Sequence, residues 1–328
     1  MDPVTLPTFD DVLAAAARIA PHAHVTPVLR SRALDALAGC ELHFKCEPLQ
    51  RAGAFKFRGA CNAVWSLSDG EAARGVVTHS SGNHGAALAL AASTRGIPCH
   101  VVVPEGAVAA KLAAIQAYGA ILHRCAPTIA AREETAARVQ RETGATFVHP
   151  YTDPRVIAGQ GTAALELLNA TGGLDVLATP VGGGGLASGC ALTLGATAPG
   201  CELLLAEPAG AADTARSLAA GRLDIDFVPD TICDGLRGTL GAPDFAILRA
   251  SGARAVVVDD ARTLEAMRLL WTRLKLLVEP SSAIAFAAVL DQRERLAGKR
   301  VGVLLTGGNV DLDAISQSFA SASRAASA

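Results

Sequence analysis

The sequence lacks the features that mark secreted, membrane-bound or nucleic-acid-binding proteins. No apolar run reaches the roughly 18 residues that a membrane-spanning helix requires, and the start, Met-Asp-Pro-Val-Thr, lacks the basic and then apolar pattern of a signal peptide. The 29 Lys and Arg residues stand against 31 Asp and Glu residues, with a net charge of −2 and no basic block. We therefore expect neither a nucleic-acid partner nor a membrane partner.

The chain also lacks cysteine and histidine spacings typical of disulfide frameworks or zinc sites. Its 8 cysteines are scattered singly, without a Cys-x-x-Cys motif and without histidines paired at ligand spacing. Single cysteines of this kind are typical of buried thiols in a reducing compartment. The sequence therefore predicts a cytoplasmic protein.

Apolar sequence, in contrast, is abundant and is divided into short segments. Half of the 328 residues are hydrophobic, enough for one large α/β unit or two domains. Short apolar runs alternate with amphipathic ones, a pattern typical of a parallel sheet covered by helices on both faces. The strand and helix rhythm predicts a small domain at residues 74–149, with residues 1–73 and 150–328 forming a large one.

The expected elements follow from this alternation. Predicted strands cover residues 41–47, 75–79, 99–103, 120–125, 146–149, 176–180, 202–206, 255–258 and 300–305. Predicted helices cover residues 12–20, 57–67, 84–95, 108–118, 129–143, 156–169, 186–194, 264–274 and 281–294. A capping box at Thr8–Asp11 precedes the first helix. The tail from Ser316 is expected to be a frayed helix or disordered, and the connection 220–246 is a candidate functional or interface loop.

Lys56 stands at the mouth of a strand-to-helix connection, where open α/β sheets bind their ligands. Taken alone, it would be interpreted as a solvated lysine in the first turn of a helix. Three glycine-containing loops after other predicted strands change this interpretation, because each of them is suited to an anionic or polar ligand. Their sequences are Ser80-Ser-Gly-Asn-His84, Pro180-Val-Gly-Gly-Gly-Gly-Leu186 and Leu305-Thr-Gly-Gly-Asn309.

The first two loops predict two different anion sites. Two hydroxyls, an amide and free N–H groups in 80–84 suit a carboxylate or phosphate, and ordinary N-capping is the alternative. Four successive glycines in 182–185 cost folding entropy, which indicates that a phosphate approaches the backbone at the following helix. A flexible turn is a poor alternative between a buried strand and a helix. In the third loop, Thr306 is placed to direct a hydroxyl into the site.

A phosphate loop, a carboxylate loop and a lysine nucleophile together predict a phosphorylated carbonyl cofactor and an amino-acid substrate. Pyridoxal phosphate supplies both a carbonyl and a phosphate, and lysine amines form Schiff bases with carbonyls. A nicotinamide-dependent oxidoreductase is a remote alternative, because Gly182, Gly184, Gly189 and Glu207 imitate a dinucleotide fingerprint. That spacing is interrupted by Ala187 and leaves the lysine unexplained. A catalytically silent ligand-binding protein is a further alternative.

Four motifs together resemble one known family. They are Gly53-Ala-Phe-Lys-Phe-Arg-Gly-Ala60, Ser80-Ser-Gly-Asn-His-Gly85, Pro180-Val-Gly-Gly-Gly-Gly-Leu186 and Thr306-Gly-Gly-Asn309. They resemble the fold-type II pyridoxal phosphate enzymes of the serine/threonine dehydratase and serine racemase group, which includes hydroxyaspartate and phenylserine dehydratases. The resemblance implies a tryptophan synthase β-like fold, with two doubly wound three-layer α/β/α domains and the cofactor in the cleft between them. It also implies a homodimer.

The resemblance assigns a role to each motif residue. Lys56 is the Schiff-base lysine and the base that removes the substrate Cα proton, and Phe55 packs beside the cofactor ring. The phosphate is held by four glycines, Gly182, Gly183, Gly184 and Gly185. The substrate carboxylate is held by Ser80, Ser81, Asn83 and His84, with Asn83 also bonded to the cofactor 3′-oxygen. Thr306 contacts the pyridine nitrogen as a neutral hydroxyl, which makes the ring a milder electron sink suited to β-elimination. The implied reaction converts a β-hydroxy-α-amino acid to a 2-oxo acid and ammonia.

The resemblance leaves several choices open. Glu207, the Ala211 carbonyl and Asp213 resemble a divalent-metal loop suited to Mg²⁺ or Ca²⁺, and helix capping is the alternative. Ser81 permits amino-acid racemisation as an alternative reaction, because it supplies a second acid/base group opposite the lysine. Arg132 lies where racemase relatives have an arginine able to meet a second substrate carboxylate, and a surface arginine is the alternative.

Three positions depart from the family pattern. Ala54 and Ala86 stand where the family commonly has Ser and Gln, and the lost bulk favours a larger β-substituent such as the phenyl group of phenylserine. Tyr151 stands where animal racemases have Asn, so we do not expect their nucleotide site here. No regulatory domain follows the catalytic part, so feedback control by isoleucine is not expected.

Overall fold

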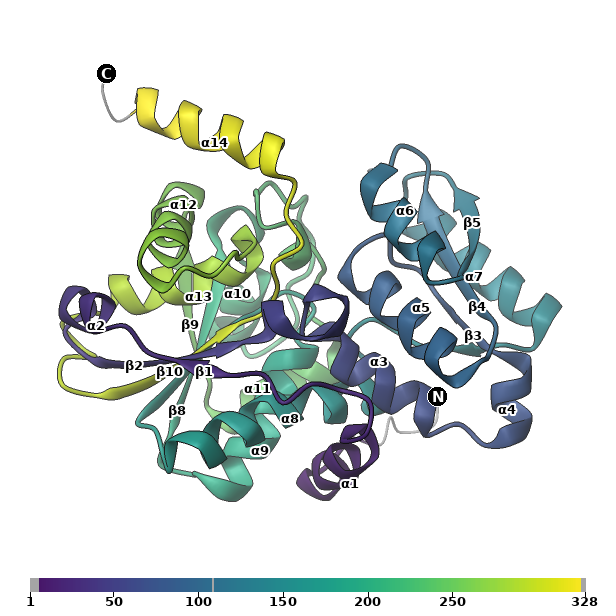
Figure 1. Cartoon of the computed structure of the whole chain (residues 1–328), viewed down its shortest axis with the longest axis horizontal. Helices are drawn as coiled ribbons and strands as arrows, with labels where there is room; N and C mark the ends of the chain where they lie inside the picture. The colour runs from purple at the N-terminus through teal and green to yellow at the C-terminus, as the bar shows by residue number, and fades with distance from the viewer. Residues whose placement is uncertain (1–5, 108, 326–328) are drawn as a thin grey trace.

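The computed structural model describes residues 6–107 and 109–325 and shows two α/β units side by side (Figure 1). The larger unit is built on a six-stranded sheet with the spatial order β1-β2-β10-β7-β8-β9. All neighbouring strands in it are parallel except β1 and β2, which are antiparallel. The strands are β1 Val28–Leu29, β2 Glu41–Cys46, β7 Val176–Pro180, β8 Glu202–Pro208, β9 Arg254–Val258 and β10 Arg300–Leu305.

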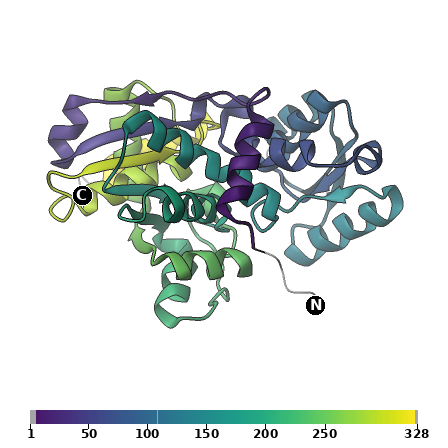
Figure 2. The same cartoon turned by 90° about the horizontal axis from the view of Figure 1, so that it is seen from below.

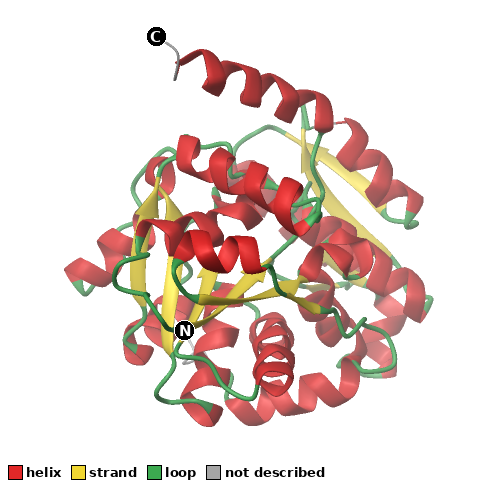
Figure 3. Cartoon of the chain, turned by 60° about the vertical axis from the view of Figure 1, so that its left-hand side comes forward, coloured by secondary structure: helices red, strands yellow, loops and turns green. Residues whose placement is uncertain are grey.

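Helices cover both faces of this sheet (Figure 3). Side chains of successive residues in a strand point to opposite faces, so Leu203 and Leu205 pack with α8, α9 and α11, whereas Leu204 packs with α2, α12 and α13. The helices of this unit are α1 Phe9–Ile19, α2 Arg32–Ala38, α8 Pro154–Thr171, α9 Gly185–Thr197, α10 Asp213–Ala220, α11 Ala242–Ser251, α12 Asp260–Leu269, α13 Pro280–Asp291 and α14 Leu312–Ala325. Figure 1 shows α14 extending away from the body of the molecule.

The smaller unit has a four-stranded parallel sheet with the order β5-β4-β3-β6. Its strands are β3 Val76–Thr78, β4 Cys99–Pro104, β5 Ile121–Cys125 and β6 Thr146–Phe147, and its helices are α4 Asp69–Arg74, α5 Asn83–Arg95, α6 Ala109–Ala117 and α7 Ile129–Thr143. The helix α3 Lys56–Trp65 connects the units, because it packs against α8 on one side and α5 on the other. Helix α1 crosses α8 and also contacts α3 and α9 (Figure 2).

Local signals define the elements that position the site. The central strand β10 is buried and apolar after its first residue, as expected for a strand covered on both faces. Helix α8 begins at Pro154, where the Asp153 side chain accepts the Arg155 N–H, and it ends at Gly172, which has a left-handed conformation. The predicted capping box is confirmed, since the Asp11 carboxylate accepts hydrogen bonds from the Thr8 N–H and hydroxyl.

The structure corrects several details of the predicted elements. The tail forms helix α14, which begins at Leu312, and residues 326–328 of that tail lie outside the described residues. Helix α11 begins inside the connection 220–246, because Pro243 in its first turn fixes a helix-compatible backbone. The predicted helix 264–274 is divided into α12 and a π-helical turn over Leu270–Leu274. The predicted helix start at Val108 lies outside the described residues.

The structure also bears on the cysteines and on membrane association. All eight cysteines are free and buried. Burial raises the pKa of the Cys46 and Cys99 thiols to about 12, so these two side chains stay protonated near neutral pH. Among the described residues, none of the helices combines the length and the apolar character that crossing a membrane requires.

Candidate active site

Lys56 is the first residue of α3 and follows the turn at the end of β2. Its Nζ donates a hydrogen bond to the carbonyl oxygen of Pro150 at 2.8 Å and lies 5.1 Å from the centroid of the Phe55 ring. Burial lowers the pKa of Lys56 to about 8, although the charge of Asp244 opposes the shift. An amine with this pKa is partly unprotonated near neutral pH, and the unprotonated amine is the nucleophilic form.

The loop after β10 lies beside the turn that carries Lys56. The carbonyl oxygen of Thr306 accepts the Phe55 N–H at 2.9 Å, and Gly308 N–H donates to the Gly53 carbonyl at 3.0 Å. Thr306 is buried, and its own N–H donates to the Ser282 hydroxyl at 2.8 Å. These bonds fix the third predicted loop against the predicted lysine turn.

Asn83 joins the first predicted loop to the third. It begins α5, directly after the Ser80-Ser-Gly segment, so the unpaired N–H groups of the first helical turn lie in this loop. Its Nδ2 donates to Glu279 Oε1 at 2.9 Å, and its Oδ1 accepts a hydrogen bond from Asn309 Nδ2 at 2.9 Å. The Ser80–His84 loop of the small unit is therefore hydrogen-bonded to the loop after β10 in the large unit.

His84 and the two serines complete the first loop. Ser80 Oγ accepts the Gly82 N–H at 3.4 Å, and Ser81 stands between these residues in the segment before α5. His84 is buried, with Nε2 3.3 Å from the Val148 carbonyl oxygen. Within the described part of the chain, its Nδ1 is buried without a hydrogen-bond partner. The loop therefore presents hydroxyls and backbone donors at a helix N-terminus, an arrangement suited to a carboxylate.

The loop of four glycines joins β7 to α9 and is enclosed by other parts of the large unit. A Cβ atom at Gly182 would lie 2.8 Å from Leu236 Cα, and one at Gly183 would overlap the Tyr151 ring. A Cβ atom at Gly185 would lie 2.8 Å from the carbonyl oxygen of Tyr151, and Gly184 has a φ of +101°, which L-residues rarely adopt. A side chain at any of these positions would clash with the surrounding protein or be strained, and the start of α9 supplies backbone N–H groups of the kind that bind a phosphate.

The turn after β6 connects this loop to Lys56. His149 Nδ1 accepts hydrogen bonds from the N–H groups of Tyr151 and Thr152 at 3.4 and 3.1 Å. Burial lowers the pKa of His149 to about 4, and the charges of His79 and Lys56 add to this effect. The imidazole is therefore neutral near pH 7 and acts as an acceptor that fixes the turn whose Pro150 carbonyl holds the lysine amine.

The predicted metal loop is formed mainly by helix-terminal contacts. Glu207 at the end of β8 accepts the N–H groups of Thr214 and Ala215 at 2.7 and 2.8 Å, so it caps α10. Asp213 Oδ2 accepts the Leu240 N–H at 2.7 Å, while its Oδ1 is buried and has no partner among the described residues. Burial raises the pKa of both carboxyl groups, that of Glu207 to about 7. The structure therefore shows the capping role, and the free oxygen of Asp213 also fits a hard cation.

Arg132 lies on α7 and is partly buried, with its Nε buried and unpartnered within the described residues. Burial lowers the pKa of His79, and the Arg132 charge adds to this lowering, so the guanidinium lies near the residue that precedes the first loop. His79 also lines a cavity of about 240 Å³ together with Glu133, Phe147 and His149. Arg132 therefore lies near His79, and among the described residues no hydrogen bond joins it to the Ser80–His84 loop.

Some of the candidate site residues were not apparent from the motifs. Pro150 and Glu279 contact Lys56 and Asn83 directly, but neither lies in a glycine loop. Asp244 lies at the start of α11 with its carboxyl group against the glycine loop, where its Oδ1 accepts the Ser188 hydroxyl at 2.9 Å. The pair Pro243-Asp244 is the signal that the sequence offers for this residue, and such a pair is typical of a helix start without indicating a ligand.

The residues present fit pyridoxal phosphate. A partly buried lysine with a lowered pKa is a nucleophile for the aldehyde. The four glycines have no side chains and lie at the N-terminus of α9, so the loop suits a phosphate bound by backbone N–H groups. Phe55 and Thr306 lie next to the lysine turn, where the resemblance places the pyridine ring. The donor set therefore agrees with the cofactor that the sequence predicts.

Comparisons with known proteins agree with this chemistry. The family model for pyridoxal-phosphate dependent enzymes matches residues 19–307. A beta-hydroxyaspartate dehydratase of Paracoccus denitrificans is 49% identical over 308 residues, which cover 94% of this chain and 98% of that protein. An L-threo-3-hydroxyaspartate ammonia-lyase of Saccharomyces cerevisiae is 44% identical over 308 residues, 94% of each chain. The solved structure of maize serine racemase has a TM-score of 0.93 with 43% identity, covering 99% of this chain and 100% of that one.

These matches confirm the family that the motifs indicate and set aside the nicotinamide interpretation. They also agree with the observed fold, two α/β units with parallel sheets. The four motifs, the lysine with its lowered pKa and the extent of the matches lead to one conclusion: the chain belongs to the fold-type II pyridoxal-phosphate dependent enzymes, in the serine/threonine dehydratase and serine racemase group.

Proposed function

We propose that this protein is a pyridoxal-phosphate-dependent ammonia-lyase that converts a β-hydroxy-α-amino acid to a 2-oxo acid and ammonia. The observation that carries the proposal is the partly buried Lys56 amine, which has a lowered pKa and a neutral carbonyl as its partner. The cofactor supplies an electron sink when bound, and Lys56 takes the substrate Cα proton. Two relatives with at least 44% identity are named for this reaction class.

The other site residues have complementary roles in this proposal. Gly182, Gly183, Gly184 and Gly185 hold the phosphate, and Phe55, Asn83 and Thr306 position the ring. Ser80, Ser81, Asn83 and His84 hold the substrate carboxylate at the N-terminus of α5. This division assigns the cofactor to a large domain, residues 1–73 and 150–328, and the carboxylate to a small domain, residues 74–149. The Asn83–Asn309 hydrogen bond across these units supports it.

The substrate that we favour is 3-hydroxyaspartate. Arg132 has a buried Nε without a hydrogen-bond partner among the described residues, so a second substrate carboxylate would satisfy it. Phenylserine is less favoured, because Ala54 is 1% exposed and forms an isolated β-bridge with Gly307. A small side chain at that position therefore opens no space for a phenyl group.

A substrate panel tests this proposal directly. Release of 2-oxo acid is measured for L-serine, L-threonine, L-threo-3-hydroxyaspartate and L-threo-phenylserine, with the wild type and Arg132→Leu. We expect hydroxyaspartate to be preferred, with a KM at least tenfold higher in the variant and little change for serine. Equal losses of activity toward serine and hydroxyaspartate in Arg132→Leu would show that Arg132 does not bind the β-carboxylate. Release from none of the four amino acids would overturn the dehydratase assignment.

Amino-acid racemisation is the second candidate function. Ser81 lies in the loop before α5 and is the candidate for the second acid/base group, and the maize protein of the same fold is named a serine racemase. Chiral analysis of serine after incubation separates the two reactions. Loss of racemisation in Ser81→Ala with elimination retained would establish both activities in one site. Equal retention of both in Ser81→Ala would exclude Ser81 as the second base.

A divalent cation, Mg²⁺ or Ca²⁺, is proposed at Glu207, the Ala211 carbonyl and Asp213. The buried and unpartnered Asp213 Oδ1 supports it, since it is the kind of hard oxygen ligand that these ions prefer. Addition of Ca²⁺ or Mg²⁺ to chelator-treated protein should raise its melting temperature, and Asp213→Asn should abolish that increase. The same melting curve with and without cations would show that the loop caps α10 only.

The family also leads us to propose a homodimer that acts in the cytoplasm. The eight free and buried cysteines support a reducing compartment. Light scattering of the holoenzyme checks the oligomeric state, and a monomer mass at micromolar concentration would contradict the dimer.

A further inference from the structure

Asp244 is a buried carboxyl group in the wall of the glycine loop. It lies in the first turn of α11, and its side chain has no exposed surface. A Cβ atom at Gly184 would lie 2.5 Å from Asp244 Cβ and 3.0 Å from its Cγ. The side chain is therefore in direct contact with the third of the four glycines. Asp244 Oδ2 lies against Gly241, whose N–H donates to the carbonyl of Gly183, the second of the four glycines, at 3.0 Å.

The two oxygens of this carboxyl group differ. Oδ1 accepts a hydrogen bond from the Ser188 hydroxyl at 2.9 Å, from the first turns of α9. Oδ2 is buried and, in the part of the chain that the structure describes, has no hydrogen-bond partner. A buried polar atom without a partner is costly, so a group that binds at this loop is expected to satisfy it.

The charges around Asp244 do not neutralise it. The charge of Lys56 on α3 acts to lower the pKa of Asp244, but the Lys56 amine is hydrogen-bonded to the Pro150 carbonyl. Tyr151, whose ring contacts the glycine loop, and Asp213 at the start of α10 are the other titratable groups nearby, and neither is a cation. Burial raises the pKa of Asp244 to about 8, although the Ser188 hydrogen bond and the Lys56 charge oppose the shift.

A phosphate ester has a second pKa near 6 and is a dianion at neutral pH. An ionised carboxylate in contact with the loop that holds this dianion would repel it, whereas a protonated carboxyl group offers an O–H donor. We propose that Asp244 is a cofactor-binding residue, whose protonated Oδ2 donates a hydrogen bond to the phosphate of pyridoxal phosphate at the glycine loop. The cofactor would thereby satisfy the buried oxygen.

This inference requires the cofactor but no particular amino-acid substrate. The dehydratase assignment can fail while the Asp244 interaction holds, and the reverse is equally true. The proposal predicts that the phosphate contributes less to cofactor binding as pH rises, because the O–H donor is lost when Asp244 ionises.

The test compares binding of pyridoxal phosphate with binding of pyridoxal, which lacks the phosphate. Dissociation constants for the wild-type apoprotein are measured by absorbance between about pH 7 and about pH 9.5, where the phosphate stays a dianion. Both ligands form the same bond with Lys56, so the ratio of the two constants isolates the phosphate. We expect this ratio to change by up to about tenfold per pH unit above about pH 8, with the phosphate contribution decreasing.

Asp244→Asn is the matched variant, because the amide keeps the shape and one donor and does not titrate. Its ratio is expected to stay constant over the whole range. A wild-type ratio that is independent of pH, or an Asp244→Asn ratio that follows the wild type, would overturn the proposal. If Asp244 acted only by changing the charge of Lys56, Asp244→Asn would change the binding of pyridoxal and of pyridoxal phosphate equally. That result would also contradict the proposed hydrogen bond to the phosphate.

Ser188→Ala provides a second test that leaves the carboxyl group in place. The Ser188 hydroxyl stabilises the ionised form of Asp244, so its removal should raise the Asp244 pKa. We expect the pH at which phosphate binding weakens to move upward in Ser188→Ala, with pyridoxal binding unchanged. An unmoved midpoint would show that another group controls the pH dependence.

Discussion

Helix α3 carries two basic side chains, Lys56, which is partly buried, and Arg58, which is fully buried, and their surroundings differ. Lys56, at its first position, has a carbonyl oxygen as its partner. Arg58, one half-turn later and fully buried, lies in an ionic cluster of Lys45, Glu47, Arg58 and Glu166. The cluster links β2, the turn after it, α3 and α8, and it includes residues on both sides of Lys56 in the sequence.

Every charge in the ionic cluster has an opposite charge as its partner. Arg58 contacts Glu47 at 2.8 Å and Glu166 at 2.7 Å, and Lys45 contacts Glu166 at 2.5 Å. Burial acts to raise the pKa of Glu47, but Arg58 outweighs it and holds this pKa below its usual range. Burial also lowers the pKa of Lys45, against the effect of Glu166. The cluster is complete without a ligand.

The candidate site shows the opposite pattern. Burial lowers the pKa of Lys56 and raises the pKa of Asp244, so both groups are shifted toward their neutral forms. Oxygen atoms of Asp213 and Asp244 and a nitrogen atom of Arg132 are buried without partners among the described residues. The difference agrees with the proposed roles, in which the paired charges fix the backbone and the unpaired groups are available to ligands.

The largest expected effect comes from breaking the ionic cluster. Arg58→Met leaves the buried Glu47 and the partly buried Glu166 without their shared cation, so we expect the free energy of unfolding to fall by about 3–5 kcal/mol. Denaturant unfolding of the apoprotein measures it. Arg58→Met combined with Glu47→Gln removes one uncompensated charge and should recover part of this loss. A fall below about 1 kcal/mol for Arg58→Met would mean that the cluster is not structurally important.

The opposite result is expected at Lys56. Below about pH 8 the amine is protonated in both the folded and unfolded chain, so its burial penalty is fully present. Between about pH 8 and the ordinary value of 10.5, the unfolded chain binds more protons, so wild-type apoprotein stability gains from Lys56 as pH rises. Lys56→Met should be more stable than wild type at pH 7, and the difference should shrink by up to about 1.4 kcal/mol per pH unit above pH 8.

Urea unfolding of both apoproteins across this pH range gives the measurement, and subtraction cancels the titrating groups that do not interact with Lys56. Lys56→Met and Lys56→Ala should also lose the bound cofactor chromophore and all turnover, whereas Lys56→Met should fold normally. A less stable Lys56→Met at pH 7, or turnover retained in either variant, would contradict the role assigned to the lysine.

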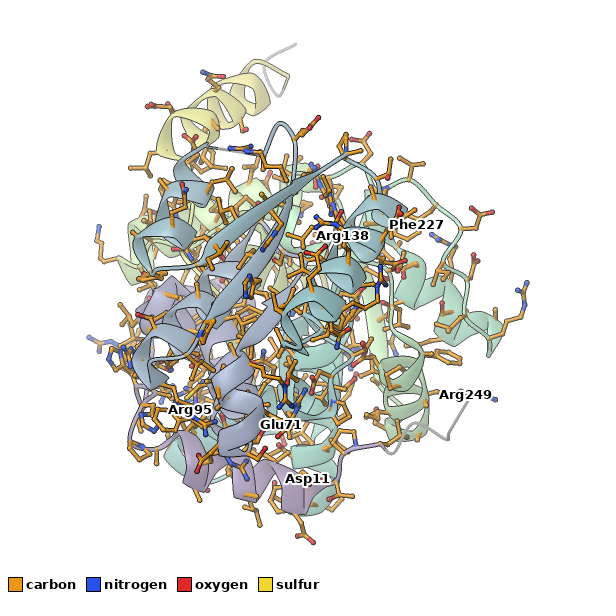
Figure 4. The ribbon with its side chains drawn as sticks, turned by 90° about the vertical axis from the view of Figure 1, so that its right-hand side faces the viewer. Asp11, Glu71, Arg95, Arg138, Phe227 and Arg249 are labelled. Carbon is orange, nitrogen blue, oxygen red and sulfur yellow. The ribbon has the colours of Figure 1, made fainter. Side chains whose placement is uncertain are left out.

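An exposed ion pair provides the smallest effect and the control for burial. Arg138, labelled in Figure 4, pairs with Glu142 one turn later on α7 at 3.1 Å, and both side chains are at least half exposed. We expect Glu142→Gln to change the free energy of unfolding by less than about 0.5 kcal/mol. A loss comparable to that of Arg58→Met would show that pairing matters here regardless of burial.

The sequence predicted the parts of the site that depend on local backbone geometry. The glycine loop and Lys56 follow buried strands of the large sheet, the Ser80–His84 loop follows a buried strand of the small sheet, and parallel strands place such loops at the carboxyl-end edge of their own sheet. The short elements β1, α2 and α4 were missed, because two to seven residues give too little periodicity to detect. Their stability comes from neighbours, as in the pairing of β1 with β2.

The partners of the site residues could not be predicted in the same way. Ser188 and Asp244 are 56 residues apart, and their contact depends on how α9 packs against α11. The same holds for the Arg58–Glu166 pair, which spans 108 residues. A motif identifies the side chain that performs chemistry, whereas the groups that adjust its pKa are set by tertiary packing.

The position of β10 has a consequence for the order in which the chain folds. This strand lies between β2 and β7 and is the last strand of the large sheet to be synthesised. The small sheet, with its strands between residues 76 and 147, has all its strands once the first half of the chain has left the ribosome. Until residue 305 has emerged, β1 and β2 are not joined to β7, β8 and β9, so the large sheet is incomplete. The small unit, with the Ser80–His84 loop, can therefore form before the large unit has completed its side of the candidate site.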